Sequence, residues 1–164
     1  VAFSAINEIP DSGNLHAHYD LNKQTESDGA VISTLVDQSG NGHDASALGQ
    51  PTMSATGFKN NPTAILDGNN DGWEVTGSDF NTLTQPFTAY WVGSLDGSLS
   101  VPNHLFDAAA STERAIMAWG REGQFWSMWS GNWLRPVGNE NDHIVAAVYN
   151  GSSSVLETHS GHLS

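Results

Sequence analysis

The residues best suited to bind a ligand lie in a tryptophan-rich stretch between positions 119 and 135. Indole rings stack on the C–H faces of sugar rings, and nearby amide or guanidinium groups bond sugar hydroxyls. On a strand, Trp126 and Met128 would lie on one face and Trp129 on the other. One face should belong to the core, and the other could contact a ligand; alternatively, most of these rings fill the core. The candidate ligand-binding residues are Trp133 and Arg135, then Trp129, with Asn132 and Trp126.

A second cluster consists of oxygen-bearing side chains in Asp67-Gly68-Asn69-Asn70-Asp71-Gly72. Its spacing matches the first half of an EF-hand calcium loop, but position twelve is Ser78 instead of Glu, and the segment lies between expected strands. We therefore expect a β-turn. A looser calcium site at Asp67, Asn69 or Asp71 is the alternative, because calcium accepts flexible oxygen cages.

The pattern of acids does not indicate catalysis. A retaining glycosidase needs two close carboxylates, and the nearest match, Glu140-Asn141-Asp142-His143-Ile144-Val145, has Val145 at the place of the second acid. His16, His18 and Asp20 would share a strand face, but a metal site there needs a further convergent ligand. Phosphate loops and nucleophile elbows are also absent from the sequence. The residues therefore favour a binding or structural protein over an enzyme.

The charge balance restricts the partners. The 164 residues include 18 Asp and Glu but only 5 Lys and Arg, which gives a formal net charge of −13. Such a chain repels the phosphate backbone of nucleic acids and anionic membrane surfaces. No apolar run approaches the roughly 20 residues of a membrane helix. The chain has no cysteine, so disulfides and zinc–thiolate sites are excluded.

The elements that must position these residues are short strands. Clusters of Gly, Asn, Ser and Asp predict turns, and the runs between them are apolar or alternating. This spacing indicates a single all-β domain, a sandwich or barrel, over residues 1–164, in which residues 1–14 form an N-terminal arm or an extra strand. The expected strands are Leu15–Leu21, Val31–Asp37, Thr63–Leu66, Trp73–Val75, Phe87–Ser94, Ala115–Trp119, Gln124–Trp129, Ile144–Tyr149 and Ser154–Thr158.

Two of these strands are apolar on both faces. Phe87–Ser94 and Ile144–Tyr149 therefore fit central strands that lie deep in a sandwich. The only stretch with weak helical character is Phe106–Arg114, where a single turn or an irregular loop is an equal alternative.

Several segments, taken in order, resemble a laminin-G-like domain of the concanavalin A-like lectin/glucanase superfamily. The resemblance spans about residues 15–155 and rests on the segments His18–Leu21, Asp37–Asp44, Asn61–Gly68, Pro86–Tyr90 and Asp142–Gly151. It implies an antiparallel jelly-roll β-sandwich. Members of this family often bind calcium, usually through other loops, so the resemblance assigns no calcium ligands here. The family also has closing strands after the segment at 154–158, which the sequence to Ser164 does not contain. Either the chain continues beyond Ser164, or a neighbouring chain completes the open edge of the sheet.

Together these features predict a noncatalytic module, extracellular or on a cell or particle surface, that recognises a glycan or a surface protein. The alternative is a structural protein of a virion, such as a capsid decoration, tail or fibre component, with the tryptophans in subunit contacts. A polysaccharide-cleaving enzyme is a third, weaker reading. A homo-oligomer or larger assembly is expected, with calcium as the only candidate cofactor.

Overall fold

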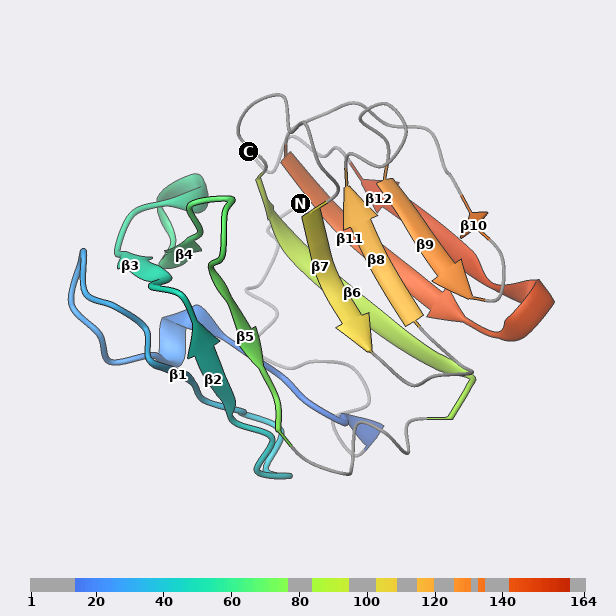
Figure 1. Ribbon diagram of the computed structural model, residues 1–164, viewed down its shortest axis with the longest axis horizontal. Coiled ribbons are helices and arrows are strands. Elements are labelled where there is room, and N and C mark those ends of the chain that lie inside the picture. Colours follow the sequence, from blue (N-terminus) through green and yellow to red (C-terminus); the bar gives the residue numbers. More distant parts are fainter. Residues whose placement is uncertain are drawn as a thin grey trace, which may run out of the picture. The chain divides into compact units, whose positions relative to one another are not determined.

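The computed structural model describes residues 14–76, 84–94, 103–108, 115–119, 126–130, 133–134 and 142–159 (Figure 1). Within these ranges the chain forms strands and short 3-10 turns and contains no α-helix. No helix there is long and apolar enough to cross a membrane. The expected all-β class is therefore confirmed. The chain divides into two compact units, Val1–Thr76 and Gly77–Ser164, which are described separately.

The first unit contains two small antiparallel sheets with a compact apolar centre. One sheet has the order β1–β2–β5 and the other pairs β3 with β4. Ile32, Ala45 and Met53 are almost completely buried between these elements and form the centre of the unit. The strands are β1 (Thr34–Leu35), β2 (Ala45–Leu48), β3 (Thr52–Ser54), β4 (Thr63–Ile65) and β5 (Gly72–Glu74).

Two strands expected in this unit are mostly irregular. In Leu15–Leu21 only an isolated bridge forms, between Tyr19 and Asp37. The segment ends where the Asp20 carboxylate accepts the N–H of Asn22 and caps a 3-10 turn at Leu21–Lys23. The expected strand Val31–Asp37 shrinks to β1, with isolated bridges at its two ends.

The second unit contains a four-stranded antiparallel sheet of order β10–β9–β8–β7. β8 has the bounds predicted from sequence, and β9 overlaps the prediction. β7 overlaps the weak helical candidate at 106–114, whose first residues are therefore a strand instead. The register between β7 and β8 shifts between His104 and Phe106, as at a β-bulge. The strands are β7 (Asn103–Ala108), β8 (Ala115–Trp119), β9 (Trp126–Ser130) and β10 (Trp133–Leu134).

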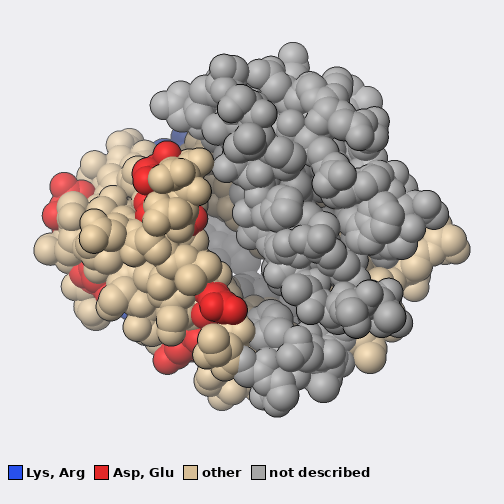
Figure 2. Space-filling model, in the orientation of Figure 1, with Lys and Arg blue, Asp and Glu red and all other residues tan. Residues whose placement is uncertain are grey.

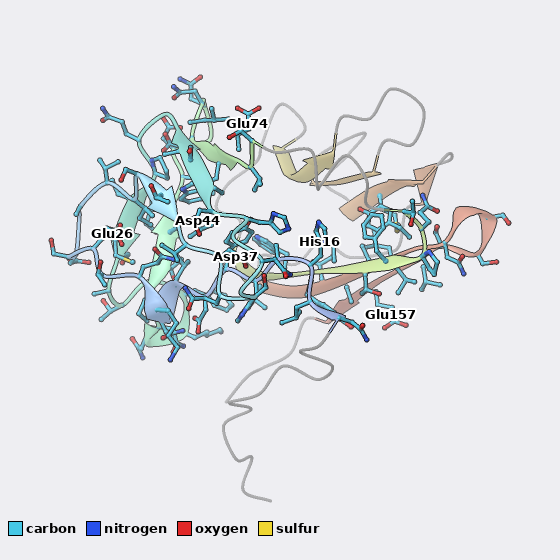
Figure 3. The ribbon with its side chains drawn as sticks, turned by 90° about the horizontal axis from the view of Figure 1, so that it is seen from below. His16, Glu26, Asp37, Asp44, Glu74 and Glu157 are labelled. Atoms are coloured by element: carbon cyan, nitrogen blue, oxygen red, sulfur yellow. The ribbon has the colours of Figure 1, made fainter. Side chains whose placement is uncertain are left out.

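The other sheet of this unit has the order β12–β11–β6. β6 (Phe87–Ser94) and β11 (Asp142–Tyr149) pair over eight residues without a register shift, and β12 (Val155–His159) pairs with residues 144–148 of β11. The predicted turn at Asn150–Ser154 joins β11 to β12 and includes a 3-10 turn at Gly151–Ser153. Figures 1 and 3 draw this sheet and the four-stranded sheet as two layers.

Burial in this sheet is one-sided, contrary to the expectation for Phe87–Ser94. Val145, Ala147 and Tyr149 of β11 are fully buried, whereas Tyr90 on β6 is 75% exposed and Val92 is 57% exposed. The register places Tyr90 opposite Ala146, on the face away from the buried residues. β6 also lies at an end of the described sheet, whereas β11 lies at its centre. The prediction of a deep central strand therefore holds for β11 and was wrong for β6.

Candidate functional site

The four-stranded sheet has one face that belongs to the core. The register aligns Leu134, Met128, Met117 and Phe106 in one row across β10, β9, β8 and β7. Met128, in the middle of this row, has no exposed surface. Because directly paired residues share a face, this entirely apolar row marks the buried side of the sheet.

The adjacent row lies on the opposite face and carries two of the candidate tryptophans. Trp133 pairs with Trp129, Trp129 with Ile116, and Ile116 with Asp107, so these four positions cross all four strands. Alternation along β9 places Trp129 on the face opposite Met128. We call this row the outer row. It combines two adjacent indole positions, one branched aliphatic position and one carboxylate position.

The other two tryptophans of this sheet lie on the face of Met128. Trp126 pairs with Trp119, and both share the face of Met128. Of the five candidate ligand residues, Trp129 and Trp133 are therefore brought together on one face, while Trp126 shares the buried face. Asn132 and Arg135 lie outside the described residues.

Chemically, the outer face suits a flat ligand with polar edges. Next to the outer row, Ser127, Ala118 and His104 form a parallel row on the same face. The paired indole positions offer stacking surface, and the hydroxyl, imidazole and carboxylate positions can exchange hydrogen bonds. No Lys or Arg occupies a described position of these four strands.

Sequence reasoning missed the β7 contribution to this face. His104 and Asp107 are three residues apart, and strict alternation would put them on opposite faces. The bulge between His104 and Phe106 brings both to the outer face. The arrangement depends on the bulge, and no clear feature of the sequence predicts a bulge at this place.

The candidate calcium cluster forms the predicted turn, at the edge of an open hollow of about 620 Å³. The carboxylate of Asp71 accepts the N–H of Gln50 at 2.7 Å and the N–H of Asp67 at 3.0 Å. Asp67 accepts the N–H of Asn69 at 2.8 Å, and this hydrogen bond is the main cause that lowers the pKa of Asp67. These oxygens therefore organise the backbone of the turn. Among the described residues, no group of three or more His, Asp or Glu is arranged to hold a metal ion.

The segment 37–44, which carries the family resemblance, folds around one carboxylate. Asp37 is 9% exposed and accepts four hydrogen bonds, from the N–H groups of His18, Ser39 and His43 and from the Ser39 hydroxyl, at 2.7–3.0 Å. The Asn41 amide donates to the carbonyls of Leu15 and His16 at 2.7 and 3.0 Å. This node ties residues 15–18 to the loop, and its role is structural. Figure 3 labels His16 and Asp37 of this node and also Asp44, whose carboxylate accepts the N–H of Asp37 at 2.8 Å.

The node also shifts the pKa values of two groups in this unit. Burial raises the pKa of Asp37, but the hydrogen bonds from Ser39, His18 and His43 outweigh it and lower the pKa to about 2. Burial, and then the negative charges of Asp37 and Asp44, raise the pKa of Tyr19 to about 12. The Tyr19 hydroxyl donates to the carbonyl of His43 at 2.6 Å, and the rings of His16 and His43 stack 4.7 Å apart. The His16–His18–Asp20 strand face expected from the sequence does not form.

Acidic side chains are spread over the described surface of the first unit, which Figure 2 shows in red on tan. No family model, no curated protein and no solved structure matches this chain. The function must therefore be argued from the geometry alone.

Proposed function

We propose that the protein is a noncatalytic binding module that recognises a glycan through the outer face of its four-stranded sheet. The observation that carries the proposal is the direct pairing of Trp129 with Trp133 on the face opposite the buried Met128. Leaving two adjacent indole rings in water is energetically unfavourable. Large apolar residues that lie together on one sheet face therefore characterise binding surfaces.

The same proposal covers the finer fold and the setting of the protein. A laminin-G-like jelly-roll sandwich is consistent with two antiparallel sheets in one unit. A chain without cysteines and with a charge of −13 suits display outside a cell or on a particle, where several weak sites act together. The candidate cofactor is calcium, at the turn that contains Asp67, Asn69 and Asp71.

The test is binding to an oligosaccharide array, followed by titration of each ligand found. Trp129→Ala and Trp133→Ala should abolish binding while the folded-state circular dichroism is unchanged. Tyr90→Ala is the matched control, because it removes an exposed aromatic ring from the other sheet of the same unit. A protein that binds no glycan, with or without calcium, would refute the proposal.

A second candidate function is supported by the exposed apolar residues of the β12–β11–β6 sheet. Tyr90, Val92 and Val155 are 75%, 57% and 46% exposed, and Val155 lies beside Val148 in register. Such a face suits subunit contacts in an assembly such as a virion. Sedimentation analysis tests this candidate. If this face forms subunit contacts, the double variant Tyr90→Ser, Val92→Ser should dissociate the oligomer. The same variant should leave glycan binding intact.

A further inference from the structure

Two asparagines of the sequence are directly followed by glycine, in Asn41-Gly42 and Asn150-Gly151. At such a pair the backbone nitrogen of the glycine can attack Cγ of the asparagine, because glycine has no Cβ that restricts the approach. A bond from that nitrogen to Cγ forms as the bond from Cγ to Nδ2 breaks. The Nδ2 group takes up the proton of the glycine nitrogen and leaves as ammonia. Water then opens the resulting succinimide ring and gives aspartate or isoaspartate.

The fold ties the side chain of Asn41 down. Its amide nitrogen donates to the carbonyls of Leu15 and His16 at 2.7 and 3.0 Å. Both hydrogen bonds must break before Cγ can turn towards the nitrogen of Gly42. Two such bonds contribute about 1–3 kcal/mol together, which slows the reaction by roughly tenfold or more. The surrounding loop is also anchored by the carboxylate of Asp37, which is 9% exposed and accepts the N–H of its neighbouring residues.

The side chain of Asn150 has no comparable restraint. It lies in the turn between β11 and β12, where residues 150–153 are all exposed. Within the part of the chain that the structure describes, its side-chain amide makes no hydrogen bond. The electrophilic carbon is therefore attached to a side chain that turns freely in solvent.

The nitrogen of Gly151 is restrained only by exposed contacts. Its N–H donates to Oε1 of Gln85, and the backbone N–H of Asn150 donates to the hydroxyl of Ser154 at 2.8 Å. Water can replace both hydrogen bonds when the turn opens. Since residues 150–153 are all exposed, none of their side chains leaves the core during such an opening, so it costs little free energy.

We propose that Asn150 is a site of spontaneous deamidation in the folded protein, and that the fold protects Asn41 from the same reaction. The reaction consumes only water and is independent of the proposed function. Each event adds one negative charge to a chain whose formal net charge is already −13. The isoaspartate product also lengthens the main chain by one methylene group in the turn that joins β11 to β12.

The experiment is incubation of the full chain at mildly alkaline pH, once folded and once in concentrated urea. Pepsin digestion at acidic pH, followed by mass spectrometry, then measures the conversion of amide to acid at each asparagine. In urea the two sites should react at similar rates. In the folded chain Asn150 should react at least about tenfold faster than Asn41, because only Asn41 must break the two amide hydrogen bonds. The rate at Asn150 should rise with pH, since the attacking nitrogen must lose its proton.

Two variants address the two sites separately. Gln85→Ala releases the N–H of Gly151 and should speed the reaction at Asn150 by about two- to tenfold without changing Asn41. Asp37→Asn loosens the loop around Asn41 and should speed the reaction there without changing Asn150. Each asparagine is therefore the internal control for the other variant, and circular dichroism shows whether the variants remain folded.

Several results would overturn the inference. One is a folded chain in which Asn150 reacts no faster than Asn41, or stays intact while the chain in urea is fully converted. A slower reaction at Asn150 in Gln85→Ala would show that Gln85 aligns the nitrogen of Gly151 instead of restraining it. An equal acceleration of both sites in Asp37→Asn would mean that global unfolding exposes Asn41, and would remove the protective role of the loop.

Discussion

The indole of Trp91 lies against Gly93, two residues further along β6. A Cβ atom added to Gly93 would come 2.5 Å from Cζ2 and 2.8 Å from Cη2 of that ring. The glycine therefore clears space for a large ring that packs along its own strand, on the face that carries the buried residues of β11. This contact helps to define which face of the β12–β11–β6 sheet is internal.

The first prediction follows from this contact. Gly93→Ala should destabilise the protein by about 1–3 kcal/mol. The indole ring of Trp91 must shift to make room for the added methyl group, and a rigid ring adjusts less easily than the flexible end of a long side chain. Gly72→Ala is the control, since Gly72 also lies in a strand but has nothing within 4 Å of an added Cβ. The control should be neutral or stabilising by up to about 1 kcal/mol. Equal urea midpoints for the two variants would contradict the packing of Trp91.

The second prediction concerns two glycines with left-handed backbone. Gly49 has φ +68° and Gly68 has φ +75°, so an alanine at either position should cost about 1 kcal/mol of strain. An added Cβ at Gly49 would also collide with Oδ1 of Asp71 and approach the carbonyl of Asn70 to 2.8 Å, whereas Gly68 has open space. Gly49→Ala should therefore cost at least about 1 kcal/mol more than Gly68→Ala in chemical denaturation. A smaller loss at Gly49 would show that the turn around Asp71 is packed differently.

The third prediction is a pH dependence of stability from Asp37. Its pKa falls from 3.8 to about 2 on folding, so the folded state favours the charged form. The stabilisation is present above pH 4 and is lost as the pH falls towards 2, and it amounts to about 2 kcal/mol. Asp37→Asn should lower the free energy of unfolding at pH 6 and flatten this acid limb.

The corresponding measurement is urea unfolding of the parent chain and Asp37→Asn at several pH values between 2 and 6. Glu157→Gln serves as the control, because it removes an exposed carboxylate from the other unit. The gap between parent and Asp37→Asn should narrow by about 2 kcal/mol across the acid range. A gap that stays constant with pH would show that the Asp37 carboxylate is not specifically stabilised in the fold.

The fourth prediction compares two valines on opposite faces of the same sheet. Val145 is fully buried on β11, and Val92 on β6 is 57% exposed. Val145→Ala should cost about 1.5–3 kcal/mol, and Val92→Ala less than about 0.5 kcal/mol. Thermal unfolding of both variants checks the assignment of faces. Similar losses would mean that the Val92 face is also covered.

The sequence predicted those strands whose ends carry strong turn signals and whose residues suit a pleated surface. Phe87–Ser94 and Ala115–Trp119 have the predicted bounds. The strands Ala45–Leu48 and Thr52–Ser54 were missed, since their short runs contain residues of low β propensity or show little alternation. Leu15–Leu21 alternates well but is held by the Asp37 node instead of a sheet.

Part of the candidate site could also be predicted from the sequence. Alternation alone placed Trp129 opposite Trp126 and Met128, and the burial of Met128 now identifies the core face. The pairing of Trp133 with Trp129 could not be deduced, because it depends on the turn between β9 and β10. The place of Asp107 depends on a bulge that a period-two pattern cannot reveal.

The most direct test of the account uses the six indole N–H signals of the chain, observed by nuclear magnetic resonance and assigned with single Trp→Phe variants. On titration with a neutral oligosaccharide that binds, the signals of Trp129 and Trp133 should shift strongly and saturably. Those of Trp119 and Trp126, which share the buried face, should stay close to their free positions. Shifts confined to Trp119 and Trp126, or to the tryptophans outside the four-stranded sheet, would contradict the account.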